Sequence, residues 1–338
     1  MKLEVVIDDL GKAIAKERNE NNQGRLRAGS SLKFNKYHRI ADINMWMEDI
    51  ATKCPPGLSC NVQTIGQSHE SRDMKIIKIG ANSNGNSTKP GIWIDCGIHA
   101  REWISPATCV YTIYRMIDDF SRGYTRATAV LNQYDWYFLP SANPDGYEFT
   151  WDDDRMWRKT RSPNSGSSCM GTDPNRNWDY QWMVAGASSN PCSYTYAGTK
   201  AFSEAETTAM RDFINSVKPS LRAYVSIHSY SQLILLPYGV APAIPADYNE
   251  LERAAKAARD ELGSMFGTVY RVGATPALLY DAAGTSADWA KFVGIKYAYT
   301  YELRDTGRYG FILPADQILA TAKETYVSLQ RLAEEMKA

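Results

Sequence analysis

Two of the four histidines in this 338-residue chain, His99 and His228, come at the ends of apolar, strand-like segments. His99 follows GIWIDCGI, and His228 follows AYVSI. Glu302 stands at the end of a third such segment, KYAYTYEL. Because open α/β sheets bind ligands at the carboxyl ends of their strands, these three side chains are expected to converge at one edge. Imidazole and carboxylate groups gathered there favour metal or acid–base chemistry.

The spacing of His99 and Glu102 in HAREW lets both side chains face one point, and Zn²⁺ accepts both ligand types. A catalytic zinc site needs three protein ligands and an open position for water, so a distant second histidine is required. His228 meets that requirement. Separately, an HxxE pair is weak evidence, and a strand-end histidine is more often a hydrogen-bonded surface residue. Together, the three residues predict a zinc site.

Asp173 is a candidate second partner for a ligating histidine, which usually donates its other ring N–H to a carboxylate or carbonyl. On local sequence alone, a turn aspartate in GTDPN is the preferred interpretation.

Strand-like and helix-like segments alternate along the chain. This alternation predicts a single α/β domain with a central mixed, largely parallel twisted sheet flanked by helices on both faces. The predicted strands are 74–80, 91–97, 135–140, 223–229 and 296–303. The predicted helices are 40–53, 105–120, 204–218, 246–266 and 315–337. Ser105 followed by Pro106 is a suitable N-cap and first-turn pair.

Composition excludes little. The formal net charge is zero, which gives no hint of nucleic acid or an anionic membrane as a partner, and no apolar run is long enough to span a bilayer. The first twenty residues are charged where a signal peptide would be apolar, so a secreted form would already have lost its leader. Six cysteines permit full pairing, and composition alone leaves free thiols and disulfides equally open.

Five long motifs occur in one order: GIHAREWISPA, NPDGYEFTWDDDRMWRKTR, DPNRNWDYQW, SIHSYSQLILLPYG and TYELRDTGRYGFILP. Because its motifs occur in this order, the sequence resembles zinc metallocarboxypeptidases of the carboxypeptidase A/B family. The resemblance extends from about Phe34 to the C-terminus. The resemblance implies a zinc-dependent exopeptidase with one Zn²⁺ per chain. It also implies non-proline cis peptides at Ser229–Tyr230, Pro237–Tyr238 and Arg304–Asp305.

The resemblance carries the family's roles onto matching positions. It implies the zinc ligands His99, Glu102 and His228, with Glu302 as general base and Arg158 stabilising the oxyanion. A planar guanidinium suits a terminal carboxylate, although most arginines are solvated surface charges. The implied substrate-binding residues are the carboxylate clamp Asn175 and Arg176, the mobile Tyr280, the outer-subsite residues Arg101, Ser229, Tyr230 and Phe311, and the pocket residues Ala287, Thr275 and Thr285.

The specificity pocket is expected to be uncharged. Basic-specific relatives have an aspartate where this chain has Ala287, so a C-terminal Lys or Arg would bury an unpaired charge. The pocket therefore favours apolar residues, aliphatic or aromatic. Thr275 and Thr285 stand where A-type enzymes usually have isoleucine and glycine, which leaves the shape open. The other expected lining residues are Leu235, Gly239, Leu279, Ala282, Ser286 and Thr300.

The resemblance also divides the chain into the tail of a pro-segment, residues 1–27, and the catalytic domain, residues 28–338. The pro-segment tail is expected to contain a short strand, a charged helix at 10–22 and an activation region that is cleaved after Arg25 or Arg27. A disordered leader is the alternative for the first part. The implied disulfides are Cys169–Cys192, Cys96–Cys109 and Cys54–Cys60, which place the protein in an oxidising, secreted setting.

The implied partners are peptide or protein C-termini, an activating trypsin-like protease and proteinaceous carboxypeptidase inhibitors. No nucleic acid or membrane is expected as a partner, and the protein is expected to be a monomer. Three alternatives to an active A-type enzyme remain. One is an inactive peptide-binding relative, although Glu302, Arg158 and the three ligands are all present. The others are a B-type enzyme with an atypical pocket, which Ala287 opposes, and a structural zinc domain, for which an open coordination position would be unusual.

Overall fold

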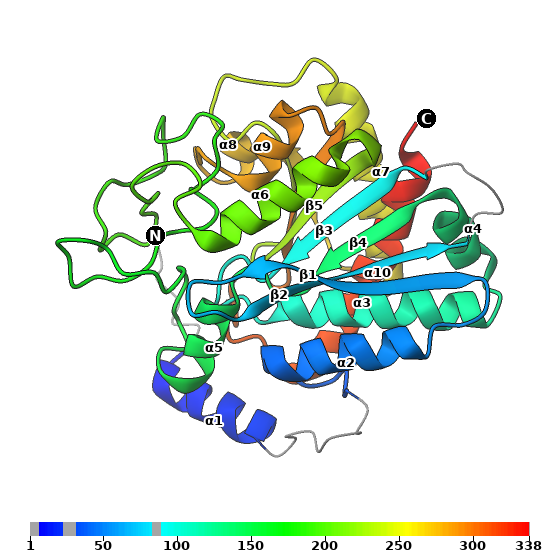
Figure 1. Ribbon diagram of the computed structural model, residues 1–338, viewed down its shortest axis with the longest axis horizontal. Helices are drawn as coiled ribbons and strands as arrows, with labels where there is room; N and C mark the ends of the chain where they lie inside the picture. Colours follow the sequence, from blue (N-terminus) through cyan, green and yellow to red (C-terminus); the bar gives the residue numbers. More distant parts are fainter. Residues whose placement is uncertain (1–6, 23–31, 83–88, 338) are drawn as a thin grey trace.

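Eight strands form one sheet in the computed structural model, which describes residues 7–22, 32–82 and 89–337. Their order across the sheet is β1-β2-β4-β3-β5-β8-β6-β7 (Figure 1). The strands are β1 (Leu58–Gln67), β2 (Asp73–Ala81), β3 (Gly91–Cys96), β4 (Asp135–Leu139), β5 (Leu221–Ser229), β6 (Leu233–Leu236), β7 (Arg271–Ala274) and β8 (Tyr297–Leu303).

The centre of this sheet is parallel. β3 pairs in parallel with β4 and β5, and β5 pairs in parallel with β8. Towards the edges, β2 runs antiparallel to β1 and β4, and β6 runs antiparallel to β8 but parallel to β7. The carboxyl ends of β3, β5 and β8 therefore meet at one edge. At that edge His228 of β5 lies directly opposite Glu302 of β8.

Helices cover both faces of the sheet, as the sequence predicted (Figure 1). Alternate β3 side chains serve the two cores: Ile92 and Ile94 belong to one, and Trp93 belongs to the other. Helices α6 (Ala205–Val217) and α9 (Ser286–Phe292) cover the Trp93 face. The opposite face is covered by α2 (Ile40–Thr52), α3 (Ile104–Ser121), α4 (Thr125–Gln133), α7 (Tyr248–Phe266) and α10 (Ile318–Glu335).

The predicted elements correspond to β2, β3, β4, β5 and β8 and to α2, α3, α6, α7 and α10, with ends shifted by a few residues. The predicted helix at 10–22 is α1 (Leu10–Asn22). The predicted N-terminal strand at 3–9 lies largely outside the described residues. The sequence patterns did not predict β1, β6, β7, α4, α9 or the short helices α5 (Pro144–Asp152) and α8 (Thr275–Leu278).

Ser105 does not cap α3, contrary to the prediction, because the helix begins one residue earlier at Ile104. Its buried hydroxyl instead accepts a hydrogen bond from the Gly97 N–H at 2.9 Å and donates to the Ile227 carbonyl. Gly97 follows β3 and Ile227 lies near the end of β5. One side chain therefore ties together the two strand ends that carry His99 and His228.

Two of the three predicted disulfides are present, Cys54–Cys60 and Cys169–Cys192. The predicted Cys96–Cys109 disulfide is wrong for this structure, since both residues are free, buried cysteines. Burial and the neighbouring Cys109 thiol raise the pKa of Cys96 well above its usual range. Thiol–disulfide exchange needs a thiolate, so a buried thiol held in its neutral form is inert.

Helix α1 docks on the domain beside α5 through a buried ion pair (Figure 1). Glu17 accepts from Nε of Arg155 at 2.6 Å and from its Nη2 at 3.1 Å. The same guanidinium donates to the carbonyls of Arg101 at 2.8 Å and Phe311 at 2.7 Å, and it lies 3.8 Å from the ring centroid of Trp103. Arg155 thus joins the N-terminal helix to two segments at the mouth of the cavity described below.

Replacing Glu17 with glutamine is expected to undock α1. Removing one partner of a buried pair costs about 3–5 kcal/mol, but here Arg155 regains water once the helix lifts away. The loss therefore appears locally, as amide hydrogen exchange in residues 10–22 that is at least about tenfold faster, rather than as global unfolding. Lys16→Gln, on the exposed side of α1, is the control. Unchanged exchange in Glu17→Gln would contradict the docking role.

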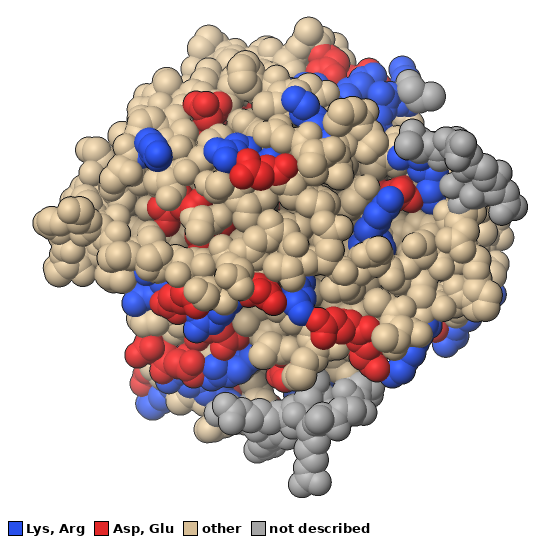
Figure 2. Space-filling view, viewed as in Figure 1, with Lys and Arg blue, Asp and Glu red and all other residues tan. Residues whose placement is uncertain are grey.

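The surface carries mixed charge on the face shown in Figure 2, where acidic and basic side chains alternate rather than forming one large patch. This agrees with the formal net charge of zero. Among the described residues, every helix is too short or too polar to cross a lipid bilayer.

Candidate active site

Three predicted ligands meet where β3 and β5 end. His99 and Glu102 lie in the turn between β3 and α3, and His228 is the penultimate residue of β5. Nδ1 of His99 lies 2.8 Å from Oε1 of Glu102, and Nδ1 of His228 lies 3.1 Å from Oε2 of the same carboxylate. One ligand atom from each residue fits within 4.8 Å of the others. The two Nδ1 atoms and the carboxylate therefore converge on one point.

The chemistry of these donors fits a zinc ion. All three side chains are buried, with exposed fractions of 4% for His99, 3% for Glu102 and 1% for His228. Burial would raise the pKa of Glu102, but the two imidazoles outweigh it and hold the pKa well below the usual range. Glu102 is thus anionic, as a metal-ligating carboxylate must be. Two imidazole nitrogens and one carboxylate form a three-ligand set of the kind found in catalytic zinc sites.

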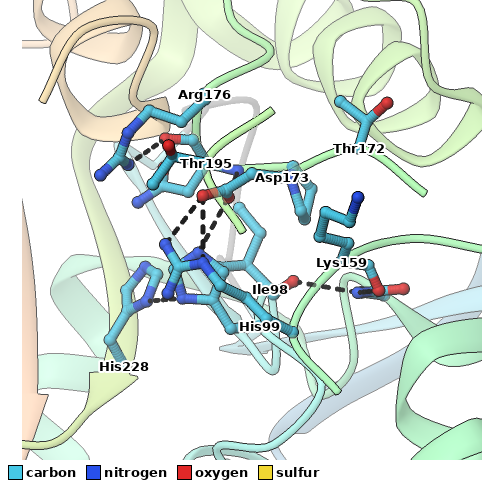
Figure 3. A network of polar contacts seen from close by, with 12 residues as sticks. Ile98, His99, Lys159, Thr172, Asp173, Arg176, Thr195 and His228 are labelled. Atoms are coloured by element: carbon cyan, nitrogen blue, oxygen red, sulfur yellow. Dashed lines mark hydrogen bonds and ion pairs between the residues drawn. The ribbon is translucent and has the colours of Figure 1, made fainter. Parts of the chain in front are cut away.

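The outer nitrogen of His99 contacts Asp173, which the local sequence had suggested was only a turn residue. Nε2 of His99 lies 3.1 Å from Oδ1 of Asp173 (Figure 3). Arg158 donates to Oδ2 of Asp173 from Nε at 3.1 Å and from Nη2 at 2.8 Å. Burial opposes ionisation of Asp173, yet Arg158 and His99 hold its pKa well below the usual range. This anionic carboxylate orients the His99 ring and leaves Nδ1 free for a metal.

One cavity brings the predicted residues together. Of the fifteen predicted site residues, fourteen line it, and the fifteenth, His228, contacts Glu102, which does. The fourteen are His99, Arg101, Glu102, Arg158, Asn175, Arg176, Ser229, Tyr230, Thr275, Tyr280, Thr285, Ala287, Glu302 and Phe311. The other lining residues are Ser231, Leu235, Leu236, Pro237, Leu279, Ala282, Asp288 and Thr300. Gly239 and Ser286, which were also expected in the wall, do not line the cavity.

Glu302 enters the cavity from β8, opposite His228. Burial raises the pKa of its carboxyl to about 8, while the nearby His228 imidazole opposes that shift. In its ionised form, a carboxylate at the cavity wall beside the ligand set can accept a proton from a bound water and return it to a leaving group.

Arg176 and Asn175 form another part of the cavity wall. Nε of Arg176 donates to the Gly186 carbonyl at 2.9 Å, and Nη1 donates to the Asn175 carbonyl at 2.7 Å. These two hydrogen bonds fix the guanidinium in place. Oδ1 of Asn175 accepts from the Ser286 N–H at 2.9 Å. Tyr280 stands at the rim with 55% of its surface exposed, and its ring centroid lies 6.0 Å from the Arg176 guanidinium.

The mouth of the cavity has an aromatic wall. The Tyr230 and Phe311 rings lie 5.0 Å apart, edge to face, and the Arg101 guanidinium lies 4.0 Å from the Phe311 centroid. The backbone N–H of Ser229 donates to Oε2 of Glu102 at 3.2 Å, so this wall is attached to the ligand set.

The hydroxyls of the two pocket threonines are both hydrogen-bonded. Thr275 donates to the Leu236 carbonyl at 3.2 Å, and Thr285 caps α9 by accepting from the Asp288 N–H at 3.3 Å. Because those polar atoms have protein partners, the threonines add less polarity to the pocket than their type suggests.

One further titratable residue, Asp288, lines the cavity next to Ala287 and was not among the residues expected there. Burial raises the pKa of Asp288 to about 7, against the lowering effect of its hydrogen bonds and of Arg176. Its Oδ2 accepts from the Gly239 N–H at 2.8 Å. Asp288 falls in the first turn of α9, where acidic side chains are common.

The predicted non-proline cis peptides at Ser229–Tyr230, Pro237–Tyr238 and Arg304–Asp305 are all present. The first two flank residues of the cavity lining.

Comparison with known proteins agrees with this site. The family model described as Zinc carboxypeptidase matches residues 43–328. Mouse carboxypeptidase A2 is 44% identical over 335 residues, which cover 98% of this chain and 78% of that protein. Human carboxypeptidase B is 46% identical over 300 residues, which cover 89% of this chain and 70% of that protein.

Solved structures agree as well. Thrombin-activatable fibrinolysis inhibitor superposes with a TM-score of 0.92 at 36% identity, over 98% of this chain and 82% of that one. Carboxypeptidase A from Helicoverpa armigera superposes with a TM-score of 0.89 at 29% identity, over 99% of this chain and 82% of that one. This chain belongs to the zinc carboxypeptidase family, and it is a metallocarboxypeptidase.

Proposed function

We propose that this protein is a one-zinc exopeptidase that removes apolar C-terminal residues from peptides, using the residues gathered in the cavity. The observation that carries the proposal is the convergence of a buried two-histidine, one-carboxylate set with Glu302, Arg158 and Arg176 at one cavity. His99, Glu102 and His228 would hold the zinc. Bound there, zinc supplies a water of lowered pKa and polarises the scissile carbonyl.

The remaining residues act on the peptide. Glu302 takes the proton from the attacking water and delivers it to the leaving amine. Arg158 offers its guanidinium to the oxygen on which negative charge develops. Arg176 and Asn175 bind the terminal carboxylate, which selects a free C-terminus, and Tyr280 closes over it from the rim.

The side-chain pocket supports an apolar preference. Ala287 presents no charge, and the hydroxyls of Thr275 and Thr285 are hydrogen-bonded within the protein. Leu235 and Leu279 add apolar surface. Relatives of both A and B type resemble the chain equally well, so the proposed preference rests on these pocket residues.

The test is hydrolysis of blocked dipeptides ending in Phe, Leu, Arg or Glu, before and after chelation. We expect the order Leu or Phe above Arg and Glu at pH 6.5, loss of activity with a chelator and recovery on adding Zn²⁺. Chelation-resistant activity would overturn the zinc mechanism. A preference for Arg at that pH would overturn the pocket proposal, and one bound zinc without hydrolysis would favour a peptide-binding protein.

Asp288 makes this preference depend on pH. Its raised pKa means that the carboxyl is neutral below about pH 7 and anionic above it. Between pH 6 and 8, the ratio of kcat/KM for C-terminal Lys to that for C-terminal Leu is therefore expected to rise about tenfold, since a hydrogen bond to a charged group contributes roughly 1.5–3 kcal/mol.

Asp288→Asn is expected to remove that rise, because the amide can still accept from Gly239 but cannot ionise. Asp281→Asn is the matched control: Asp281 is exposed and accepts from the Ala241 N–H at 3.2 Å. A Lys-to-Leu ratio that stays constant with pH in the unmodified chain would contradict the role of Asp288.

Residues 1–27 remain a proposed pro-segment tail, and cleavage after Arg25 or Arg27 by a trypsin-like protease would release α1. Both arginines lie outside the described residues. The disulfides Cys54–Cys60 and Cys169–Cys192 support secretion into an oxidising compartment. Bovine thrombin-activatable fibrinolysis inhibitor, 38% identical over 90% of this chain, has been solved with a tick carboxypeptidase inhibitor. We propose that this protein binds such inhibitors as a monomer.

A further inference from the structure

The second ligand histidine, His228, has its own chain of hydrogen bonds on the side away from the cavity. Nε2 of His228 lies 3.1 Å from the hydroxyl oxygen of Ser226. That hydroxyl donates its one proton to Oδ1 of Asp95 at 2.7 Å. The Ser226 oxygen therefore accepts the Nε2–H of His228. This arrangement places the imidazole proton on Nε2 and leaves the Nδ1 lone pair facing Glu102 and the metal position.

The sheet itself sets up this chain. Ser226 and His228 are two residues apart on β5, so both side chains lie on one face of the sheet. Asp95 is the register partner of Ser226 on the neighbouring parallel strand β3. Its other oxygen accepts from the indole N–H of Trp93 at 3.0 Å. The backbone pairing of β3 and β5 thus fixes both the serine and the carboxyl against the histidine.

Asp95 is unusual because it is fully buried and no Lys or Arg among the described residues forms an ion pair with it. A buried carboxylate without a cation is expensive unless other charges compensate it. Two neutral donors, the Ser226 hydroxyl and the Trp93 indole N–H, hydrogen-bond to its oxygens instead. By contrast, Asp173 beside His99 is paired with Arg158. The two ligand histidines therefore have carboxylates of different kinds, one in direct contact and one reached through a hydroxyl.

We propose that Ser226 and Asp95 are positioning residues for the metal site, which hold His228 in the tautomer and orientation that zinc requires. The inference rests on the proposed zinc site and adds the support of its second histidine. Outer partners of ligating histidines commonly change metal affinity by 10–100-fold, because they fix the ring and raise its basicity.

Ser226→Ala is expected to weaken zinc binding by about 10–100-fold, measured by competition with a chromophoric chelator, without reference to activity. The melting temperature of the metal-free protein is measured alongside it. Ser328→Ala is the control, because Ser328 on α10 is equally buried, does not line the cavity, and has its hydroxyl oxygen 3.1 Å from that of Tyr301. That variant is expected to lower the melting temperature and leave the zinc dissociation constant unchanged.

Asp95→Asn tests the second step of the chain and preserves side-chain size. We expect weaker zinc binding than in the unmodified protein, and a double variant with Ser226→Ala that binds zinc no more weakly than Ser226→Ala alone. Unchanged affinity in Ser226→Ala, or additive losses in the double variant, would overturn the proposal. An unmodified chain that binds no zinc would instead overturn the proposed function. If Ser226→Ala fails to fold, an unchanged dissociation constant in Asp95→Asn overturns the proposal by itself.

Discussion

Glu302→Gln is expected to lower kcat by roughly 10²–10⁴-fold, the usual contribution of a positioned acid–base group. Glutamine has nearly the same shape and fills the same place opposite His228, but it cannot accept a proton from the attacking water. The substrate contacts of Arg176 and the ligand set are untouched. KM for a blocked dipeptide ending in Leu should therefore change far less than kcat, which steady-state kinetics at saturating substrate would measure.

Metal content separates this effect from damage to the site. Glu302→Gln should retain one zinc per chain, measured by elemental analysis after dialysis. Glu252→Gln, at a partly exposed position on α7 that pairs with Lys256, should behave as the unmodified enzyme. Activity within about threefold of the unmodified enzyme would remove Glu302 from the mechanism.

Arg158→Lys is the second large effect expected. A lysine keeps the positive charge beside Asp173 but loses the planar guanidinium that donates twice to that carboxylate and still reaches the cavity. Loss of one oxyanion donor commonly costs about 10²–10³-fold in kcat. We expect kcat to fall by that amount with little change in KM, since the terminal carboxylate is held by Arg176.

Arg161→Lys serves as the matched control, because Arg161 lies on the rings of Phe149 and Trp157 and does not line the cavity. It should be nearly silent in kcat. If Arg158→Lys loses its zinc together with its activity, then Arg158 acts mainly through Asp173 and His99, and the oxyanion role is contradicted.

The ligand set could be predicted because its two histidines are rare residues near strand ends, Glu102 is three residues from His99, and all three lie within long motifs. What surrounds the set could not. Asp95 and Ser226 are single polar residues inside GIWIDC and AYVSIH, runs that predict buried strands and say nothing about which neighbour a polar side chain will face. Only the β3–β5 register brings them together. Asp288 was missed for a related reason, since the short helix α9 that turns it toward the cavity was not predicted.

The fold was predictable where hydrophobic patterns are long. β6 and β7 have only four residues each, and β1 is a half-exposed edge strand with polar residues throughout, so none of them gave a strong signal. Ser105 shows a different limit. Ser-Pro before an apolar run suggested an N-cap, but a hydroxyl that can bridge two strand ends is used there, and no local pattern reveals a partner 122 residues away.

The pairing of His228 with Glu302 across β5 and β8 means that an error in strand register would affect catalysis more than metal binding. Side chains alternate between the faces of a strand, so a slip of β8 by one residue would turn Glu302 to the opposite face of the sheet. The ligand set on β3 and β5 could still form, and the misfolded chain would bind metal without turning over substrate. In a preparation of this protein, molecules with β8 out of register would therefore be found among those that hold zinc but are inactive.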